Sequence, residues 1–168
     1  VVAQPAARIV SLGAPALRGP VACVDLETTG GMAVHHRIIE VGIVLLEDGE
    51  IVEEWSSLVN PGVRIPSAIE VFTGISNEMV ADAPAFADVR AEVRRRLDGR
   101  LFVAHNARFD YGFVRNEFRR LGEKFSAPVL CTVRLSRKLD RMMHLAIRET
   151  KRAEETLEEV VESVRDGK

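Results

Sequence analysis

Long hydrophobic runs are missing from this chain of 168 residues, and Pro5 and Arg8 interrupt the apolar stretch at its start. A signal peptide and a membrane span are therefore not expected, and we expect a cytoplasmic protein. Cysteine is scarce as well, with only Cys23 and Cys131. Two distant thiols exclude a disulfide framework and a zinc-ligand spacing. Both lie in strand-like runs, where a free thiol is expected to be buried as a small apolar group.

An excess of basic residues is also lacking. The chain has 23 Lys and Arg against 25 Asp and Glu, a net charge of −2 at pH 7. This excludes a protein that coats nucleic acid through charge alone. The charge is unevenly distributed, because residues 149–168 hold seven acids and four bases and residues 1–148 hold the other 18 acids and 19 bases. The larger part is nearly neutral, as suits a transient binder of nucleic acid.

Apolar residues make up 46% of the chain, enough for the core of one domain. Periodicity predicts strands first and alternating helices and strands afterwards, which favours an α/β fold with a mixed central sheet, an antiparallel meander followed by parallel strands, flanked by helices. Ser67 and Glu70 have the spacing of a capping box for a short helix that Gly74 ends. The predicted strands are 21–27, 38–46, 51–59, 101–104 and 129–132, and the other predicted helices are 84–97 and 110–121. We expect an arm or linker at 1–20, a core domain at 21–139 and an amphipathic helical tail at 140–168.

Acidic residues follow two of these predicted strands. In the segment 25–30, Asp-Leu-Glu-Thr-Thr-Gly, Asp25 and Glu27 project from one face of a strand about 7 Å apart. In the segment 105–110, His-Asn-Ala-Arg-Phe-Asp, Asp110 lies at or near a helix start. If the two strands are neighbours, three carboxylates meet at one mouth of the sheet and can hold one or two hard divalent cations. The alternative is that the first two are solvated strand-end acids and Asp110 is a helix cap.

These segments resemble the motifs of the DnaQ-like 3′-5′ exonucleases, the family of the proofreading epsilon subunit of DNA polymerase III. Residues 25–30 match its D-x-E-T-T-G motif, and residues 105–110 match its H-N-x-x-F-D motif. The resemblance extends over residues 21–139 and implies a ribonuclease-H-like fold. Residues 54–61 and 101–120 look most similar to the branch that is fused to a GIY-YIG nuclease domain.

The resemblance implies a site for two divalent cations, Mg²⁺ or Mn²⁺, held by Asp25, Glu27 and Asp110. Two ions roughly 3.5–4 Å apart stabilise the attacking and leaving oxygens of a phosphodiester hydrolysis. The implied substrate is a single-stranded or frayed DNA 3′ end, and the implied partners are a DNA polymerase or a second nuclease domain. RNA stays open, because nothing in the sequence reads a 2′-hydroxyl. Oligomeric state is not indicated.

Several further residues are candidates for substrate binding. Asn106 either bonds a phosphate or positions the following acid, or else it caps the helix. Phe109 either stacks on a base or packs in the core. The resemblance adds backbone contacts and an apolar wedge at the terminal nucleotide, for which the candidates are Leu26, Thr28, Thr29, Thr73 and Ile75.

The third motif of the family, a His followed five residues later by an Asp, has only a partial match. His144 and Glu149 keep the spacing, as candidates for the general base and a fourth metal ligand, but only eleven residues separate His144 from Thr132. The same stretch has an apolar residue every three or four positions, which is typical of one continuous amphipathic helix. On such a helix the two side chains lie about 140° apart and do not face one pocket.

Two hypotheses from different classes follow. The first is a divalent-metal-dependent 3′-5′ exonuclease that releases nucleoside monophosphates. The second is a catalytically impaired relative that binds nucleic acid or protein, in which residues 140–168 are a truncated motif, a replaced segment or a partner-binding helix. The short connection before His144 and the acidic amphipathic tail motivate the second hypothesis.

Overall fold

The computed structural model of the protein describes residues 19–145 and residue 148. The predicted arm, apart from residues 19 and 20, and most of the predicted tail lie outside the described residues. In chain order the named elements are β1 (Val21–Thr28), β2 (Ile38–Glu47), β3 (Glu50–Leu58), α1 (Ser67–Thr73), α2 (Asn77–Ala81), α3 (Phe86–Leu97), β4 (Leu101–Ala104), α4 (Arg108–Arg120) and β5 (Val129–Cys131).

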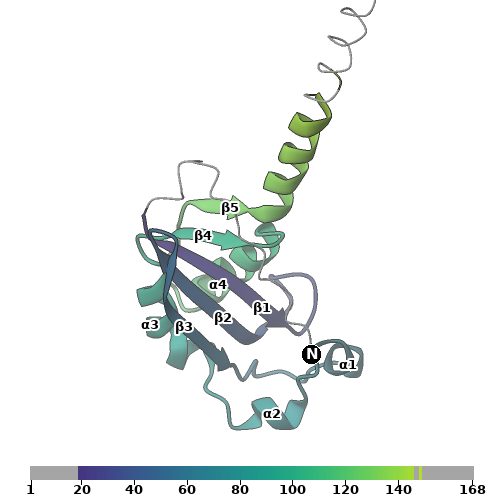
Figure 1. Cartoon of the computed structure of the whole chain (residues 1–168). Coiled ribbons are helices and arrows are strands. Elements are labelled where there is room, and N and C mark those ends of the chain that lie inside the picture. Colours follow the sequence, from purple (N-terminus) through teal and green to yellow (C-terminus); the bar gives the residue numbers. More distant parts are fainter. Residues whose placement is uncertain (1–18, 146–147, 149–168) are drawn as a thin grey trace, which may run out of the picture.

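The five strands form one mixed sheet in the order β3-β2-β1-β4-β5 (Figure 1). The pairs β1 with β2 and β2 with β3 are antiparallel, whereas β4 is parallel to both β1 and β5. Asp48 and Gly49 close the hairpin between β2 and β3 with φ angles of 53° and 91°, a left-handed conformation that Asp and Gly tolerate best. The predicted antiparallel meander followed by parallel strands is confirmed.

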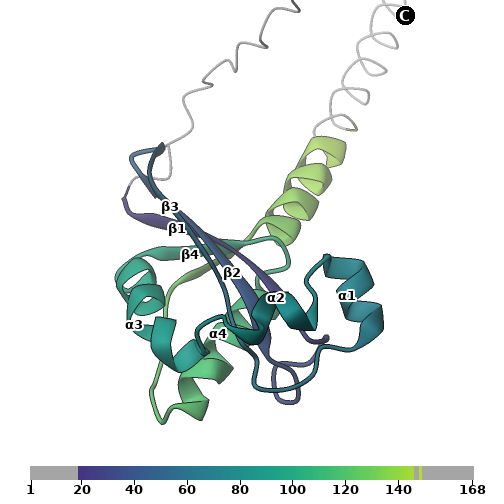
Figure 2. The same ribbon diagram turned by 90° about the horizontal axis from the view of Figure 1, so that it is seen from below.

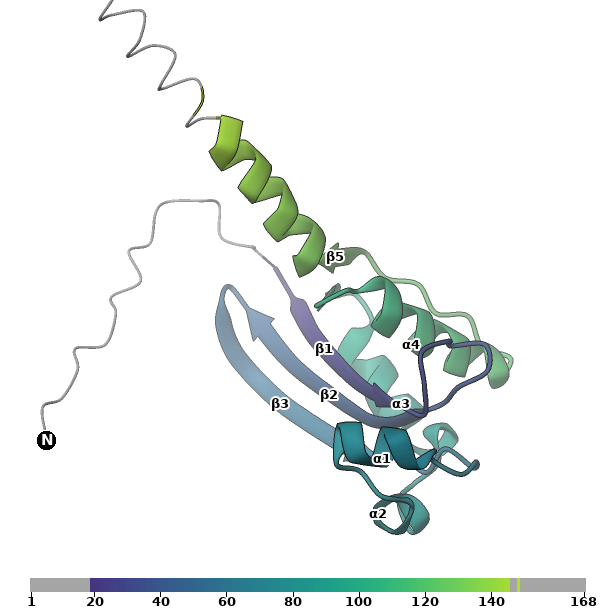
Figure 3. The same ribbon diagram turned by 90° about the vertical axis from the view of Figure 1, so that its right-hand side faces the viewer.

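Side chains of β1 divide between the two faces of the sheet. Ala22, Val24 and Leu26 are buried on the face that α3 and α4 cover, in a core that includes Phe86 and Phe118. Figures 2 and 3 show these two helices together on that side of the strands. The alternate residues, including Asp25, project from the other face, which no helix packs across in the part of the chain that the structure describes. We call this the open face.

The local capping pattern differs from the prediction at α1. Pro66 occupies the N-cap position, Ser67 is already helical, and no side chain caps the helix. The carboxylate of Glu70 accepts hydrogen bonds from the amide and side chain of Asn77 instead, at 2.7 and 2.6 Å. The predicted capping box is therefore wrong, because the acid ties α1 to α2 rather than to its own N-terminus. Gly74 ends the helix in the left-handed conformation, as predicted.

Helix α2 was not expected from the sequence. Its five residues are too few for a recognisable periodicity, and its one local signal is Ser76, whose Oγ accepts a hydrogen bond from the Met79 amide at 3.3 Å. Cys23 and Cys131 are half-buried rather than fully buried.

A helix follows β5 directly and runs over residues 132–145. Every residue of it from 134 onward is exposed. Figures 1 and 3 show it leaving the edge of the sheet and projecting away from the other elements. Within residues 19–145, no helix is long and apolar enough to cross a membrane.

Candidate active site

A pocket of about 370 Å³ lies where β1 ends and α4 begins, with α1 at its side. Its walls come from these three elements and from the turns that follow β1 and β4. The lining residues are Asp25, Leu26, Glu27, Thr28, Gly30, Gly31, Ile69, Phe72, Thr73, His105, Asn106, Phe109 and Asp110. Two segments 80 positions apart, which the sequence singled out separately, thus share one cavity.

The sheet register explains why the pocket opens there. Strand β4 pairs only with residues 21–23 of β1, so the second half of β1 extends past its parallel neighbour. Strand β2 supports the extension on the other side as far as Thr28. The space beyond the end of β4 is filled by the start of α4, which places Asp110 beside β1. On this second half of β1, Asp25 is exposed and Glu27 is half-buried.

The Asp110 carboxyl is the buried acid of the site, with 4% of the residue exposed. Burial raises its pKa from 3.8 to about 6, and the negative charges of Asp25 and Glu27 contribute to the rise. Hydrogen bonds from the backbone amides of Asp110 and Leu26 act in the opposite direction. The pKa of Glu27 is also raised, first by burial and then by the charges of Asp25 and Glu40. The acids therefore repel one another, and a nearby cation would relieve the repulsion.

The carboxylates of the pocket are the groups that could hold a divalent cation. Among residues 19–145, no three His, Cys, Asp or Glu side chains are close enough to enclose a metal ion. The chemistry nevertheless fits a hard cation, because Asp25, Glu27 and Asp110 line one pocket and offer oxygen ligands only. Metal binding would require these carboxylates to move closer together than they are in this structure.

The turn before α4 is held by its own backbone. Asn106 has a φ of 63°, and its carbonyl accepts a hydrogen bond from the Phe109 amide at 2.8 Å. Ala107 rather than Asn106 is the N-cap residue of α4, so the capping alternative for Asn106 is wrong. The Nδ1 atom of His105 lies 3.0 Å from the hydroxyl of Thr132. Asn106 lines the pocket.

The threonines after β1 have different positions. Thr28 lines the pocket, and its hydroxyl donates to the carbonyl of Gly30 at 2.9 Å. Thr29 is 3% exposed and is not among the lining residues, because its hydroxyl accepts a hydrogen bond from the Arg37 amide at 3.0 Å. The Leu26 side chain is buried in the core, although the residue also borders the pocket.

Helix α1 supplies the apolar wall. Thr73 lines the pocket, whereas Ile75 is buried in a separate cluster with Ile39 and Ile65. Phe72 also lines the pocket and is 84% exposed, although the sequence did not single it out. The available signal was an aromatic residue directly before Thr73 on a short helix. A ring this exposed has open faces for a ligand.

Of the two candidates from the third motif, only His144 is a described residue, and it is not at this pocket. His144 is exposed on the projecting helix 132–145 and is not among the lining residues. Glu149 lies outside the described residues. Among the described residues, the geometry therefore brings the first two motifs together without His144.

The mixed sheet order and the flanking helices are those of the ribonuclease-H-like fold, and solved exonuclease structures share them. Exonuclease I bound to the C-terminal peptide of SSB has a TM-score of 0.66 at 15% identity over 72% of this chain and 30% of that one. Exonuclease X in complex with 5′ overhanging duplex DNA has a TM-score of 0.58 at 30% identity over 71% of this chain and 63% of that one.

Sequence relatives give the family. The profile of the Exonuclease (RNase_T) family matches residues 22–165, and the chain belongs to this family. It is 46% identical over 118 residues to the 3′-5′ exonuclease DinG of Bacillus subtilis, which covers 68% of this chain and 12% of that protein. It is 40% identical over 115 residues to a PolC-type DNA polymerase III of Clostridium perfringens, covering 68% of this chain and 8% of that protein. The chain thus spans about a tenth of these relatives. Placement in the branch fused to a GIY-YIG domain stays a prediction.

Proposed function

We propose that this chain is a divalent-metal-dependent 3′-5′ exonuclease that releases nucleoside monophosphates from DNA 3′ ends. The observation that carries the proposal is the single pocket lined by Asp25, Glu27 and Asp110 together with Phe72 and Phe109. Carboxylates that face two aromatic side chains suit a phosphodiester on one side and a nucleobase on the other.

Each part of the pocket has a role in the proposal. Asp25, Glu27 and Asp110 hold the cations, and Mg²⁺ or Mn²⁺ supplies charge stabilisation and an activated water when bound. Asn106 donates to a phosphate oxygen. The backbone near Leu26 and Thr28 cradles the terminal nucleotide.

The remaining predicted residues fit the proposal less directly. Thr73 contacts the terminal nucleotide beside the apolar wall that α1 supplies. Thr29 and Ile75 do not line the pocket, and their proposed role is to hold the Arg37 loop and the residues after α1 in place.

We favour DNA over RNA as the substrate because the names of two similar proteins refer to DNA. Exonuclease X is described in complex with DNA, and the PolC-type relative is a DNA polymerase. A polymerase or a second nuclease domain is the proposed partner in the same polypeptide or in a complex. A cytoplasmic location stays a prediction.

The decisive experiment is digestion of a 5′-labelled single-stranded DNA oligonucleotide in Mg²⁺ and in Mn²⁺. We expect a ladder from the 3′ end that Asp25→Asn abolishes. The matched control is Asp48→Asn, which removes one charge in the hairpin turn, where Asn also tolerates the positive φ. Full activity of Asp25→Asn would falsify the proposal.

The catalytically impaired alternative is favoured by one observation, the exposed position of His144 away from the pocket. Measuring His144→Ala separates the two cases. A loss of about 10²–10⁴-fold in rate supports His144 as the general base. An unchanged rate removes that role, whereas the predicted role of Glu149 as a metal ligand needs its own variant, Glu149→Gln. Binding of a 3′ end without any turnover by the wild-type chain supports the impaired alternative.

A further inference from the structure

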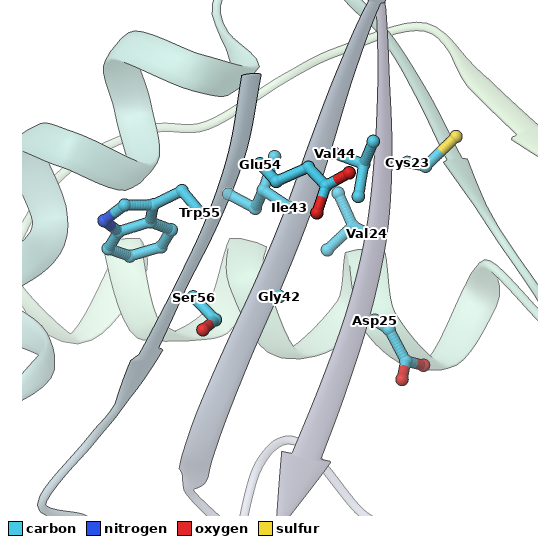
Figure 4. A pocket seen from close by; sticks show the side chains of 9 residues that line it. All are labelled: Cys23, Val24, Asp25, Gly42, Ile43, Val44, Glu54, Trp55 and Ser56. Atoms are coloured by element: carbon cyan, nitrogen blue, oxygen red, sulfur yellow. The ribbon is translucent and has the colours of Figure 1, made fainter. Parts of the chain in front are cut away.

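The open face of the sheet carries a hollow of about 400 Å³. Two cross-strand rows build it, Cys23 with Val44 and Glu54, and Asp25 with Gly42 and Ser56. Gly42 lies in the middle of its row and has no side chain, so the floor is backbone. Figure 4 shows Glu54 extending from β3 over β2 toward this hollow.

The hollow has an apolar floor and an acidic rim. Val44 and the Cys23 thiol provide apolar surface on the face opposite α3 and α4. The acids of this face on β1, β2 and β3 are Asp25, Glu27, Glu40 and Glu54. None of the four forms an ion pair with another described residue. The face therefore fits an element that is apolar along its middle and basic at its side.

The projecting helix 132–145 has this character. Leu135, Leu139 and Met142 follow one another at helical spacing and are 42%, 51% and 56% exposed. We call these three residues the stripe. The same helix carries four bases, Arg134, Arg137, Lys138 and Arg141, against the single acid Asp140. Within residues 19–145 none of these bases pairs with an acid, so apolar surface and positive charge are both unpartnered.

The helix does not reach its own open face. It continues directly from edge strand β5 and runs away from the sheet (Figures 1 and 3). No Gly or Pro occurs in residues 129–145, so this helix contains no turn signal that would fold it back. A helix of 14 residues is roughly 20 Å long, enough to cross three strands.

We propose that helix 132–145 of one copy packs its stripe into the hollow of a second copy. Helix 132–145 of the second copy packs into the hollow of the first in the same way. Such a reciprocal contact closes as a two-fold dimer. Leu139 and Met142 fill the space above Gly42, and the bases beside them meet Glu54. Apolar burial and charge complementarity then act in the same contact.

The exchange has a consequence for catalysis, which rests on the function proposed above. Asp25 borders both the hollow and the candidate active site. The exchanged helix therefore brings basic side chains beside the carboxylates, where they can contact the phosphates of a DNA strand. His144 lies on the side of the helix opposite the stripe, so the exchange does not deliver it to the pocket.

Directed cross-linking tests which copy supplies the helix. Two versions of the chain are mixed, both carrying Cys131→Ser. One keeps Cys23 in the hollow, and the other has Cys23→Ser together with Leu135→Cys, Leu139→Cys or Met142→Cys in turn. A short bismaleimide is expected to join the two versions at one or more of these positions. Asp140→Cys, on the opposite side of the helix, is the matched control.

Three results overturn the proposal. The first is no joined product at any stripe position, and the second is equal joining at the control. The third result comes from a single version of the chain that carries both Cys23 and a stripe cysteine. If the reagent joins these two cysteines only within one chain and never between two chains, the proposal fails. That last outcome would mean that the helix returns to its own sheet.

Sedimentation provides an independent measurement. The wild-type chain is expected at twice its mass of 18.6 kDa, and Leu139→Glu with Met142→Glu at 18.6 kDa. Gly42→Phe should have the same effect by filling the hollow, because a Cβ there meets only the Asp25 carbonyl oxygen at 3.7 Å. Val71→Glu, on an even more accessible apolar residue of α1, is the control that should stay dimeric. A wild-type monomer at every concentration also overturns the proposal. These readouts do not depend on nuclease activity, so either proposal can fail alone.

Discussion

The carboxylate of Glu117 accepts two hydrogen bonds from the guanidinium of Arg37, at 2.7 and 3.0 Å. Glu117 is 1% exposed and lies on α4, whereas Arg37 ends the loop that follows β1. Arg120 joins the same carboxylate and also donates to three carbonyls of that loop. A buried acid on α4 therefore fixes the loop at the rim of the candidate active site.

Arg37→Ala is expected to destabilise the protein by about 3 kcal/mol, because it leaves the Glu117 charge buried with a single remaining partner. Urea unfolding measures this change. Arg90→Ala is the control, since its pair with Glu123 is largely exposed and should cost less than about 1 kcal/mol. Equal losses in the two variants would contradict the buried pair's role.

Asp110 gives a pH dependence of known sign. Its pKa of about 6 in the folded protein exceeds the unfolded value near 4, so the folded state holds the proton more tightly. The resulting stability is fully present below about pH 4 and is lost as pH rises through 6. In a metal chelator, Asp110→Asn should therefore gain stability relative to wild type between pH 4 and 7, by about 1–3 kcal/mol. Urea unfolding at several pH values checks this, and a constant difference between the two proteins would refute it.

Cation binding should oppose the loss of stability that accompanies ionisation of Asp110. Mg²⁺ or Mn²⁺ that binds only the folded state stabilises it by about 2.7 kcal/mol at 100 times its dissociation constant. The thermal midpoint should rise more at pH 8 than at pH 5, because a protonated Asp110 competes with the metal. Asp25→Asn should reduce the rise. A rise that is equal at both pH values, or unchanged in the variant, would place the cation elsewhere.

Phe72→Ala should affect substrate binding without affecting stability. The ring is 84% exposed, so its removal costs little in folding, within about 0.5 kcal/mol. Stacking on a base contributes about 1–3 kcal/mol, which predicts a KM for single-stranded DNA raised by roughly 10-fold to 100-fold. Val71→Ala is a close control, because Val71 is 86% exposed on the same helix but does not line the pocket. Equal KM values for the two variants would exclude stacking by Phe72.

The fold was predictable wherever the signal was local. Alternation in β1 and in the β2–β3 hairpin gave those strands nearly to the residue, and Gly74 gave the end of α1. Helix α2 was missed because five residues carry no period. The first capping residue of α1 was misplaced because the Glu70 side chain has a better partner in Asn77, which only the tertiary structure brings near.

The site was predictable in part for a related reason. Asp25, Glu27 and Asp110 stand out because acids at strand ends are recognisable in a sequence. Phe72 was not singled out, since exposure depends on how α1 packs. The position of His144 depends on the direction in which a long helix leaves β5, and periodicity alone does not fix that direction.

Among the strands that the structure describes, β3 and β5 are the edges of the sheet, and both are poorly suited to further strands. β3 carries Glu50, Glu53 and Glu54, which would be repelled by the same strand of another copy. β5 has only three residues, too few for a stable added strand. Fibrous growth by strand addition is therefore disfavoured at both of these edges.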